Sequence, residues 1–315
     1  MKWKTAGAFL GLSALLAGAG YWMRESKAAD AVRFAWSRDS LCPLRQVWLR
    51  VTEYRETAAL IDQAIEAERI VATDGGLELV ETTQGRYWIP RRNHAVMAEM
   101  VVDRGRGVYE SGTHGVQNGD VVLDCGANVG VFTRHALDRG ARLVVAVEIS
   151  PQNLECLRRN FAAEIKAGRV IVYPNGVWDR EEERDLRIYE DQSGGDSVAL
   201  QFPGSRPGPR VRLTTIDILA AELKLDRVDF IKMDVEGAER KALAGARLTV
   251  EKHRPRMSIA LEHELADREE TPRLVRTLWP DAQLDYGPCV CVETEFVRRL
   301  QPEVLMTHFS KGTGI

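Results

Sequence analysis

The chain has 315 residues, enough to bury a substantial core as one domain with an extension. Its formal net charge is −3 and its pI about 6.1, so no overall basic field favours binding to nucleic acid. The cysteines are odd in number and scattered, which predicts reduced thiols rather than a disulfide framework. They are Cys42, Cys125, Cys156, Cys289 and Cys291, of which the last two are expected at alternate positions of a strand.

Near the amino terminus, two lysines precede an uncharged run, residues 5–23. At about 1.5 Å per residue, a helix over this run is just long enough to cross a hydrocarbon layer of about 30 Å. We expect residues 1–30 to be a hydrophobic anchor or signal. A retained membrane helix is the first interpretation, a cleaved secretory signal the second, and a soluble packed helix the third. More Lys and Arg follow the run than precede it, which favours an anchor with the body of the chain in the cytoplasm.

Residues 31–96 are predicted to form an α+β extension or cap. Apolar residues at helical spacing occur within 41–69, and a helix is expected to begin at Met97, where the main domain, 97–315, starts. The extension either packs on the sheet of that domain or shapes a substrate entrance. Between its helices the sequence predicts short strands at 70–72, 76–80 and 85–90.

From residue 119 onward, strand patterns alternate with helix patterns. This alternation predicts an α/β fold with a parallel sheet covered on both faces. Such sheets bind ligands at the carboxyl ends of their strands. The predicted strands are 121–124, 143–148, 170–173, 228–234, 257–262, 289–292 and 304–308, with helices at 153–166 and 239–253.

A short turn with a distinctive spacing, Asp124-x-Gly126-x-Asn128-x-Gly130, follows the first of these strands. A strand, a tight turn and a helix start place several backbone N–H groups around one concave spot, and glycine lets a ligand approach them closely. The dinucleotide spacing G-x-G-x-x-G is absent. A carboxylate before the first glycine also suits a cationic ligand that carries an amino acid better than a pyrophosphate. These four residues are therefore predicted to bind a nucleotide-like cofactor.

Polar residues also follow the next two strands. Glu148 ends the second strand, where a carboxylate can accept hydrogen bonds from both hydroxyls of a ribose. Ser150 and Asn153, close to it, are weaker candidates for the same ligand. Asn175 and Gly176 follow the third strand, where an adenine edge would lie; a plain turn is the alternative.

Three acids, including Asp234 and Glu236, follow the fourth strand within six residues. They could be a solvated helix start, but their place beside the cofactor turn favours a role in orienting a substrate, accepting a proton or holding a divalent cation. Lys232 lies inside the apolar fourth strand and needs an acidic partner if it is buried. His263, after the fifth strand, is a candidate general base or an ordinary rim histidine. No metal ligand is assigned.

The segments DCGANVG, VAVEIS and FIKMDVEGAE, with a following strand that ends in Glu262-His263, resemble FkbM-type class I S-adenosylmethionine-dependent methyltransferases. The resemblance covers about residues 85–262. It implies a Rossmann-like sheet of seven strands with the last one antiparallel, and methyl transfer to an oxygen, often on a sugar or natural-product hydroxyl. It also implies that the glycine turn holds the methionine part of S-adenosyl-L-methionine and that Glu148 holds the ribose.

The sequence therefore predicts a methyltransferase that uses S-adenosyl-L-methionine and acts on a hydroxyl of a sugar, glycolipid or small metabolite. Asp234, Glu236 and His263 are its candidate catalytic residues. The expected partners are that acceptor and, through the N-terminal helix, a membrane, but not nucleic acid. One alternative is a membrane-tethered, non-catalytic binding protein on a methyltransferase scaffold. A nucleotide-linked oxidoreductase is less favoured because of the glycine spacing.

Overall fold

The computed structural model describes residues 27–309 except 39–40, 43, 45–46, 111–113, 190–192, 202, 265, 288 and 294–297. Within these residues, no helix has the length and apolar character needed to span a membrane. This finding corrects the expectation of a membrane-anchored localisation with a cytoplasmic body. The hydrophobic run 5–23, on which that expectation depended, lies outside the described residues.

The chain divides into two compact units. The smaller unit comprises the chain up to Ala59 together with Cys289–Pro302, and the larger comprises Leu60–Pro288 and the chain from Glu303. In the smaller unit, α2 (Lys27–Ser37) and the first part of α3 (Val47–Ala67) share a core with the antiparallel pair β13 (Cys289–Glu293) and β14 (Arg298–Pro302). The buried side chains of this core are Phe34, Cys42, Val47, Val51, Cys289 and Leu300.

A disulfide bond joins Cys42 to Cys289 within the smaller unit. The expectation that all the cysteines are reduced was therefore wrong. The two residues are 247 positions apart, and only the return of the chain to the smaller unit after β12 (Ala282–Tyr286) brings them together. Cys125 and Cys156 are free and buried.

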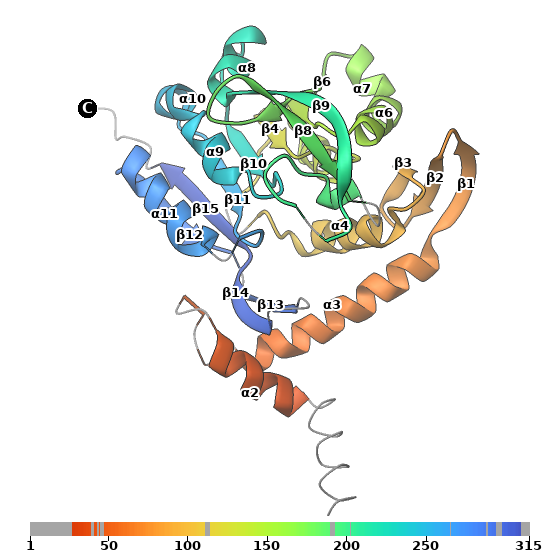
Figure 1. Ribbon diagram of the computed structural model, residues 1–315, viewed down its shortest axis with the longest axis vertical. Coiled ribbons are helices and arrows are strands. Elements are labelled where there is room, and N and C mark those ends of the chain that lie inside the picture. Colours follow the sequence, from red (N-terminus) through yellow and green to blue (C-terminus); the bar gives the residue numbers. More distant parts are fainter. Residues whose placement is uncertain are drawn as a thin grey trace, which may run out of the picture. The chain divides into compact units, whose positions relative to one another are not determined.

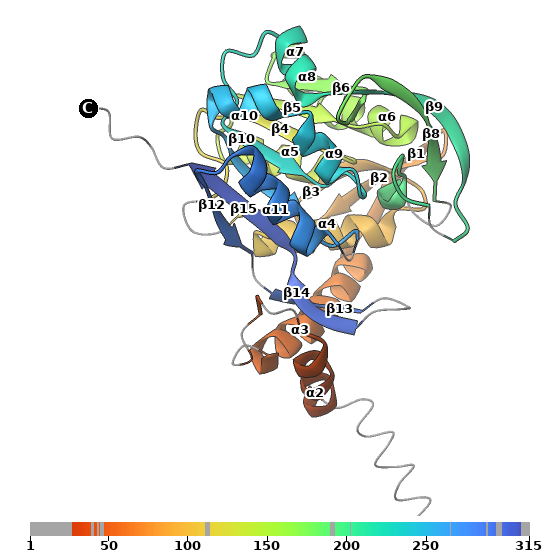
Figure 2. The same cartoon turned by 60° about the vertical axis from the view of Figure 1, so that its left-hand side comes forward.

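The larger unit is built on a seven-stranded sheet (Figures 1 and 2). Six strands are parallel and β15 is antiparallel to its neighbours, which confirms the predicted Rossmann-like α/β sheet with a reversed last strand. The strand order is β12, β15 (Val304–Phe309), β11 (Arg256–Ala260), β10 (Phe230–Met233), β4 (Val121–Cys125), β5 (Leu143–Val147) and β6 (Val170–Tyr173).

One strand of this sheet differs from the prediction. The sixth strand in chain order is β12, whereas the sequence predicted a strand at 289–292, and that segment is β13 of the smaller unit. β12 lies at the edge of the sheet and alternates half-buried with exposed residues. It therefore lacks the continuous apolar run that marks a strand buried on both faces.

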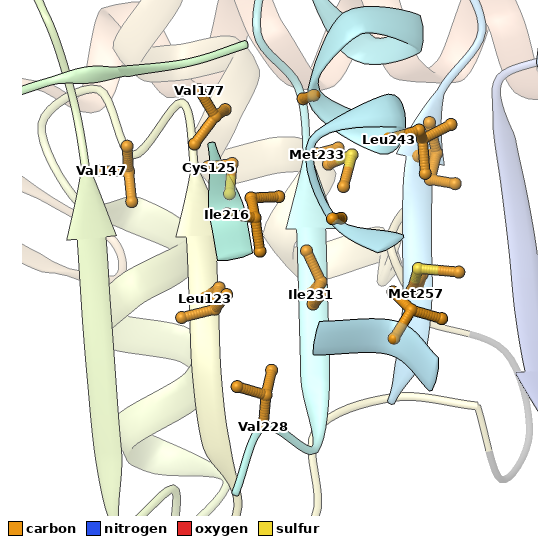
Figure 3. Packing of buried hydrophobic residues seen from close by; sticks show 14 of the residues in the cluster. Leu123, Cys125, Val147, Val177, Ile216, Val228, Ile231, Met233, Leu243 and Met257 are labelled. Atoms are coloured by element: carbon orange, nitrogen blue, oxygen red, sulfur yellow. The ribbon is translucent and has the colours of Figure 1, made fainter. Parts of the chain in front are cut away.

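Helices cover both faces of the sheet. On one face, side chains of β4, β10 and β11 pack against four helices, and Figure 3 shows Leu123, Ile231 and Met257 on this face with Ile216 beside them. On the other face, Val122, Val144 and Phe230 pack against a second set of helices. The first set is α8 (Ile216–Glu222), α9 (Glu239–Ala244), α10 (Arg247–His253) and α11 (Asp267–Leu278). The second set includes α5 (Val131–Asp138) and α6 (Pro151–Asn160). The short helix α7 (Ala162–Lys166) follows α6.

Two small sheets accompany the central one. The first, β1 (Arg69–Asp74), β2 (Leu77–Thr82) and β3 (Gly85–Pro90), confirms the three strands predicted there. Its apolar side chains share a core with α4 (His94–Arg106) and the start of α5. The second sheet contains β7 (Gly176–Val177), β9 (Arg206–Thr214) and β8 (Glu182–Ile188), and the short 3-10 helix η2 (Ser193–Gly195) follows β8.

Loss of the disulfide should lower stability, because the bond closes a very long loop and so restricts the unfolded chain. We expect reduction, or the double substitution Cys42→Ser with Cys289→Ser, to cost about 2–4 kcal/mol. Urea unfolding with and without a reductant measures this cost. The reductant should not alter the double variant, and equal stability of the oxidised and reduced wild-type chains would contradict the prediction.

Candidate active site

A cavity of about 450 Å³ lies at the carboxyl ends of the central strands. Its walls come from α4 and the loop after it, the glycine turn after β4, the ends of β5, β10 and β11, and the loop that contains η2. Four of the predicted site residues do not line the cavity but are buried: Asp124, Gly130, Ser150 and Asn153. The predicted residues that line it are Gly126, Asn128, Glu148, Asn175, Gly176, Asp234, Glu236 and His263.

Lys232 is buried beside the cavity and binds two acids. Asp124 and Lys232 face each other in the parallel pair β4–β10, so their side chains leave the sheet on the same face. Lys232 Nζ lies 3.6 Å from Asp124 Oδ1 and 3.3 Å from Asp234 Oδ2. Burial alone would lower the pKa of Lys232, but the carboxylates of Asp234 and Asp124 outweigh it and raise the pKa. The prediction that a buried Lys232 has an acidic partner is confirmed.

Asp124 acts from beneath the glycine turn. Its carboxylate is fully buried and accepts a hydrogen bond of 2.6 Å from the Thr133 hydroxyl on α5. Burial raises the pKa of Asp124, although Lys232 and Thr133 both favour its ionised form. Asp124 therefore holds Lys232 and the start of α5 in place, and its side chain is not exposed to a ligand.

The glycine turn and the acidic loop after β10 touch through their backbones. Lys232 Nζ donates to the Gly126 carbonyl at 2.9 Å, and the Asp234 N–H donates to the Cys125 carbonyl at 3.1 Å. A Cβ atom on Gly126 would lie 1.7 Å from the Asp234 carbonyl oxygen, so only glycine fits there. Gly130 is a packing residue, because its Cβ would lie 2.2 Å from the ring of Phe161.

Glu148 fixes the turn from the end of β5. Its Oε2 accepts a hydrogen bond of 2.8 Å from the Asn128 N–H, and its Oε1 accepts two of 2.7 Å from the N–H groups of Ile149 and Ser150. Burial raises the pKa of Glu148 to about 7, although these three N–H groups favour the ionised form. Both carboxylate oxygens are thus held in place at the cavity wall.

The sequence did not single out Asp196, which follows η2 and lines the cavity. Its Oδ2 accepts a hydrogen bond of 2.8 Å from the Ser150 hydroxyl, and its Oδ1 accepts one of 3.0 Å from the Tyr189 N–H. Ser150 therefore positions this loop rather than facing the cavity. The Gly194-Gly195-Asp196 run is the signal that could have indicated this loop.

The three predicted catalytic residues lie together on the other side of Lys232. His263 Nε2 is 3.4 Å from Asp234 Oδ1 and 3.6 Å from Glu236 Oε2, and His263 Nδ1 is 3.0 Å from Glu239 Oε1. Burial alone would lower the pKa of His263, but Glu239 and Glu236 outweigh it and raise that pKa well above its usual range. His263 is therefore a cation at neutral pH in this arrangement.

Glu236 enters the cavity from an unusual backbone position. Its φ is 52°, in the left-handed region that residues other than glycine seldom adopt. The Ser197 hydroxyl donates a hydrogen bond of 2.8 Å to the Glu236 carbonyl and holds this conformation. Backbone strain of this kind costs about 1–3 kcal/mol and often occurs at functional sites.

The remaining wall of the cavity is acidic and was missed by the sequence analysis. Burial is the main cause that raises the pKa of Asp103 on α4 to about 7, and neighbouring charges such as Glu99 add to it. Burial, despite the nearby His263, raises the pKa of Glu262 to about 8. Glu99 and Asp103 are four residues apart in a helix, and this spacing places them on one face and could have indicated the wall. The carboxylates of this wall are Glu99, Asp103, Glu262 and Glu303.

Tyr109 joins this wall to the acidic loop. Its hydroxyl donates a hydrogen bond of 2.8 Å to Asp234 Oδ2, the same oxygen that faces Lys232. Burial raises the pKa of Tyr109 well above its usual range, and Asp234 and Glu262 add to the effect. Tyr109 therefore stays a neutral donor, and Asp234 Oδ1 is left facing His263.

The strand order and a cavity beside a glycine turn define a Rossmann-like α/β protein with a ligand site at the carboxyl ends of its strands. Residues 124–299 match the methyltransferase FkbM domain family. This match spans more than half of the chain, so the chain belongs to the FkbM methyltransferase family and is a methyltransferase.

Other known proteins are similar over part of their length. The chain is 26% identical over 274 residues to the AMB antimetabolite synthetase AmbE of Pseudomonas aeruginosa, in a match covering 69% of this chain and 12% of that protein. The crystal structure of methyltransferase FkbM from Methylobacillus flagellatus KT is 18% identical, with a TM-score of 0.44, over 82% of this chain and 62% of that one. TYW2 of M. jannaschii, solved in complex with AdoMet, is 13% identical, with a TM-score of 0.38, over 76% of this chain and 88% of that one.

The contact between the two loops can be tested with a pair of glycine substitutions. Gly126→Ala and Gly119→Ala put the same methyl group on similar left-handed backbones, with φ of 81° and 86°, but only Gly126 has an atom within 4 Å of the new Cβ. We expect Gly126→Ala to cost about 1–3 kcal/mol more than Gly119→Ala in urea unfolding, because the loops must separate. Equal costs would show that the loops are not in contact.

Proposed function

We propose that the protein transfers a methyl group from S-adenosyl-L-methionine to a hydroxyl of a sugar, a glycolipid or a small metabolite. Membership of the FkbM family supports methyl transfer. The observation that carries the proposal is that the glycine turn with Glu148 and the group Asp234, Glu236 and His263 line one cavity. A donor and an acceptor bound in that cavity would therefore lie side by side.

The residues at the donor end fit S-adenosyl-L-methionine. Glu148 Oε1 already accepts two backbone N–H groups, whereas Oε2 accepts one and has capacity left to accept a ribose hydroxyl. Asn128 Oδ1 is buried and has no hydrogen-bond partner among the described residues, so it can accept an N–H from a ligand. The many carboxylates of the cavity suit a donor with a cationic sulfonium and an ammonium group.

The chemistry of this donor leaves little covalent work to the protein. When bound, S-adenosyl-L-methionine supplies an activated methyl group: the new O–C bond forms as the C–S bond breaks, and a neutral thioether leaves. The protein has to align the acceptor oxygen, exclude water and take the hydroxyl proton. The side chains at the acceptor end of the cavity perform these tasks.

Glu236 is the best placed of these side chains to take the proton. Burial raises the pKa of Glu236 despite the nearby His263, which makes its carboxylate a stronger base. Burial alone would raise the pKa of Asp234, but Lys232 and His263 outweigh it and lower that pKa. Asp234 therefore orients the acceptor with Tyr109 and Lys232, and cationic His263 holds Asp234 and Glu236 in place.

One local sequence match bears on the class of acceptor. The local match to an antimetabolite synthetase supports a small metabolite, although the chain spans only 12% of that protein. Labelled S-adenosyl-L-methionine added with the protein to cell extracts should yield one labelled product, and mass spectrometry should show a gain of one methyl group. Extracts without any labelled product under conditions where the donor binds would contradict the proposal.

Donor binding should depend on the ionisation of Glu148. Its pKa is about 7, and the ionised form accepts a ribose hydroxyl at Oε2, so donor affinity should be up to about tenfold weaker at pH 6 than at pH 8. Glu148→Gln should bind weakly and lose this part of the pH dependence. Calorimetry of S-adenosyl-L-methionine binding at both pH values tests this expectation.

Two controls belong to that measurement. Other carboxylates of the cavity also titrate near neutral pH, so the difference between the wild type and Glu148→Gln is the quantity to compare. Glu155→Gln, on the exposed side of α6, should behave as the wild type. Wild-type affinity and an unchanged pH profile in Glu148→Gln would remove Glu148 from the donor site.

Loss of the proton acceptor should affect turnover and leave donor binding intact. We expect Glu236→Gln to slow methyl transfer by about 100-fold or more, because a positioned base accelerates proton removal by that amount. The Kd for S-adenosyl-L-methionine should stay close to that of the wild type. Label transfer into the acceptor and calorimetry measure the two quantities, with Glu251→Gln on α10 as a surface control. Wild-type turnover would exclude Glu236 as the base.

A further inference from the structure

Asp234, Glu236 and His263 also form a group with the composition of a metal site. Each offers one ligand atom, and these atoms lie within 4.8 Å of one another; no other such group was found in the described part of the chain. Two carboxylates and one imidazole are ligands that divalent first-row metals accept. All three side chains line the cavity, which leaves further coordination positions open to a ligand.

The distances in the group suit a cation better than a set of hydrogen bonds. His263 Nε2 lies 3.4 Å and 3.6 Å from the two facing oxygens, beyond the about 2.9 Å typical of N–H···O bonds. Ligand atoms about 2.1 Å from a shared cation lie about 3.0–3.4 Å from one another in octahedral or tetrahedral geometry. Small side-chain movements would therefore complete the coordination.

The second ring nitrogen of His263 lies against Glu239 in an ion pair without well-aligned hydrogen-bond geometry. The side chain is only 9% exposed, and its Nδ1 faces Glu239 Oε1 at 3.0 Å while its Nε2 points to the other two residues. The Val235 N–H donates a hydrogen bond of 2.7 Å to the same Glu239 oxygen and fixes it. A carboxylate on the second ring nitrogen is the usual support of a metal-bound histidine.

The balance of charge also favours a cation here. Four carboxylates are linked in one series of ion pairs through only two basic groups, Lys232 and His263. Buried charges are costly unless they are compensated. Asp234 Oδ2 is already occupied by Tyr109 and Lys232, so Oδ1 is the oxygen left for a cation. The carboxylates are those of Asp124, Asp234, Glu236 and Glu239.

We propose that Asp234 Oδ1, a Glu236 oxygen and His263 Nε2 bind a divalent first-row cation such as Mn²⁺, which displaces the proton of His263 Nε2 and coordinates the acceptor hydroxyl. The catalytic part of this inference rests on the proposed methyl transfer, whereas the binding part does not. The coordinated hydroxyl loses its proton to the Glu236 oxygen that does not hold the cation. Its oxygen would then form the new bond to the methyl carbon as the methyl–sulfur bond of the donor breaks and the neutral thioether leaves.

Binding is tested on the full chain after treatment with a chelator. Titration with Mn²⁺, followed by electron paramagnetic resonance and calorimetry, should show one site per chain. Asp234→Asn, Glu236→Gln and His263→Gln should each weaken it by more than about tenfold. Glu262→Gln removes a neighbouring carboxylate of the cavity outside the group and should retain the site. Urea unfolding of each variant shows whether it is folded, and Glu236, partly exposed, is the substitution most readily tolerated.

The outcomes separate this inference from the proposed function. If the chain binds S-adenosyl-L-methionine but shows no Mn²⁺ site, the cation site is overturned and the donor site still stands. The same conclusion follows if Glu262→Gln weakens Mn²⁺ binding as much as the substitutions within the group do. A chain that binds Mn²⁺ at the group but not the donor supports the site and contradicts the proposed function. Methyl transfer should fall more than about tenfold on chelation and return with Mn²⁺; unchanged transfer would overturn the catalytic role of the cation.

Discussion

The ammonium group of Lys232 connects the two ends of the site. It is almost fully buried, and removing a charge from water is costly unless acids compensate it. Asp124 supplies one carboxylate from beneath the glycine turn, and Asp234 supplies the other from the acidic loop. Lys232 also donates a hydrogen bond to the Gly126 carbonyl. These contacts together fix the distance between the glycine turn and the acidic loop. The proposed donor and acceptor positions depend on this spacing.

The central strands could be predicted because they are buried on both faces. Such strands consist of nearly continuous apolar residues, as in β4 and β5, and polar residues then mark their carboxyl ends. The need of a buried Lys232 for an acidic partner follows from elementary electrostatics, and the structure shows it. The proximity of Asp234, Glu236 and His263 followed from a general rule, since the carboxyl ends of adjacent parallel strands meet at one edge of a sheet.

Other features depend on tertiary contacts that the sequence does not express locally. Cys42 and Cys289 meet only because the chain leaves the larger unit after β12 and returns to it at β15. The place of Asp124 in the sequence predicts an acid that faces a ligand. In the structure its carboxylate is buried and accepts a hydrogen bond from Thr133 on α5. The acidic wall combines α4 with Glu262 after β11 and Glu303 before β15, which follow Asp103 by 159 and 200 positions. No local stretch of the sequence contains both parts of this wall, so local patterns do not predict it.

The disulfide constrains the order in which the chain can be completed. Cys289 follows six of the seven strands of the large sheet, and only β15 comes after it. During synthesis, the bond to Cys42 cannot form until nearly the whole sheet has left the ribosome. The helices of the smaller unit are synthesised first, yet the disulfide bond that joins this part of the chain to β13 can form only near the end of synthesis. A chain that stalls before residue 289 would lack the partner of Cys42 and would keep it as a free thiol.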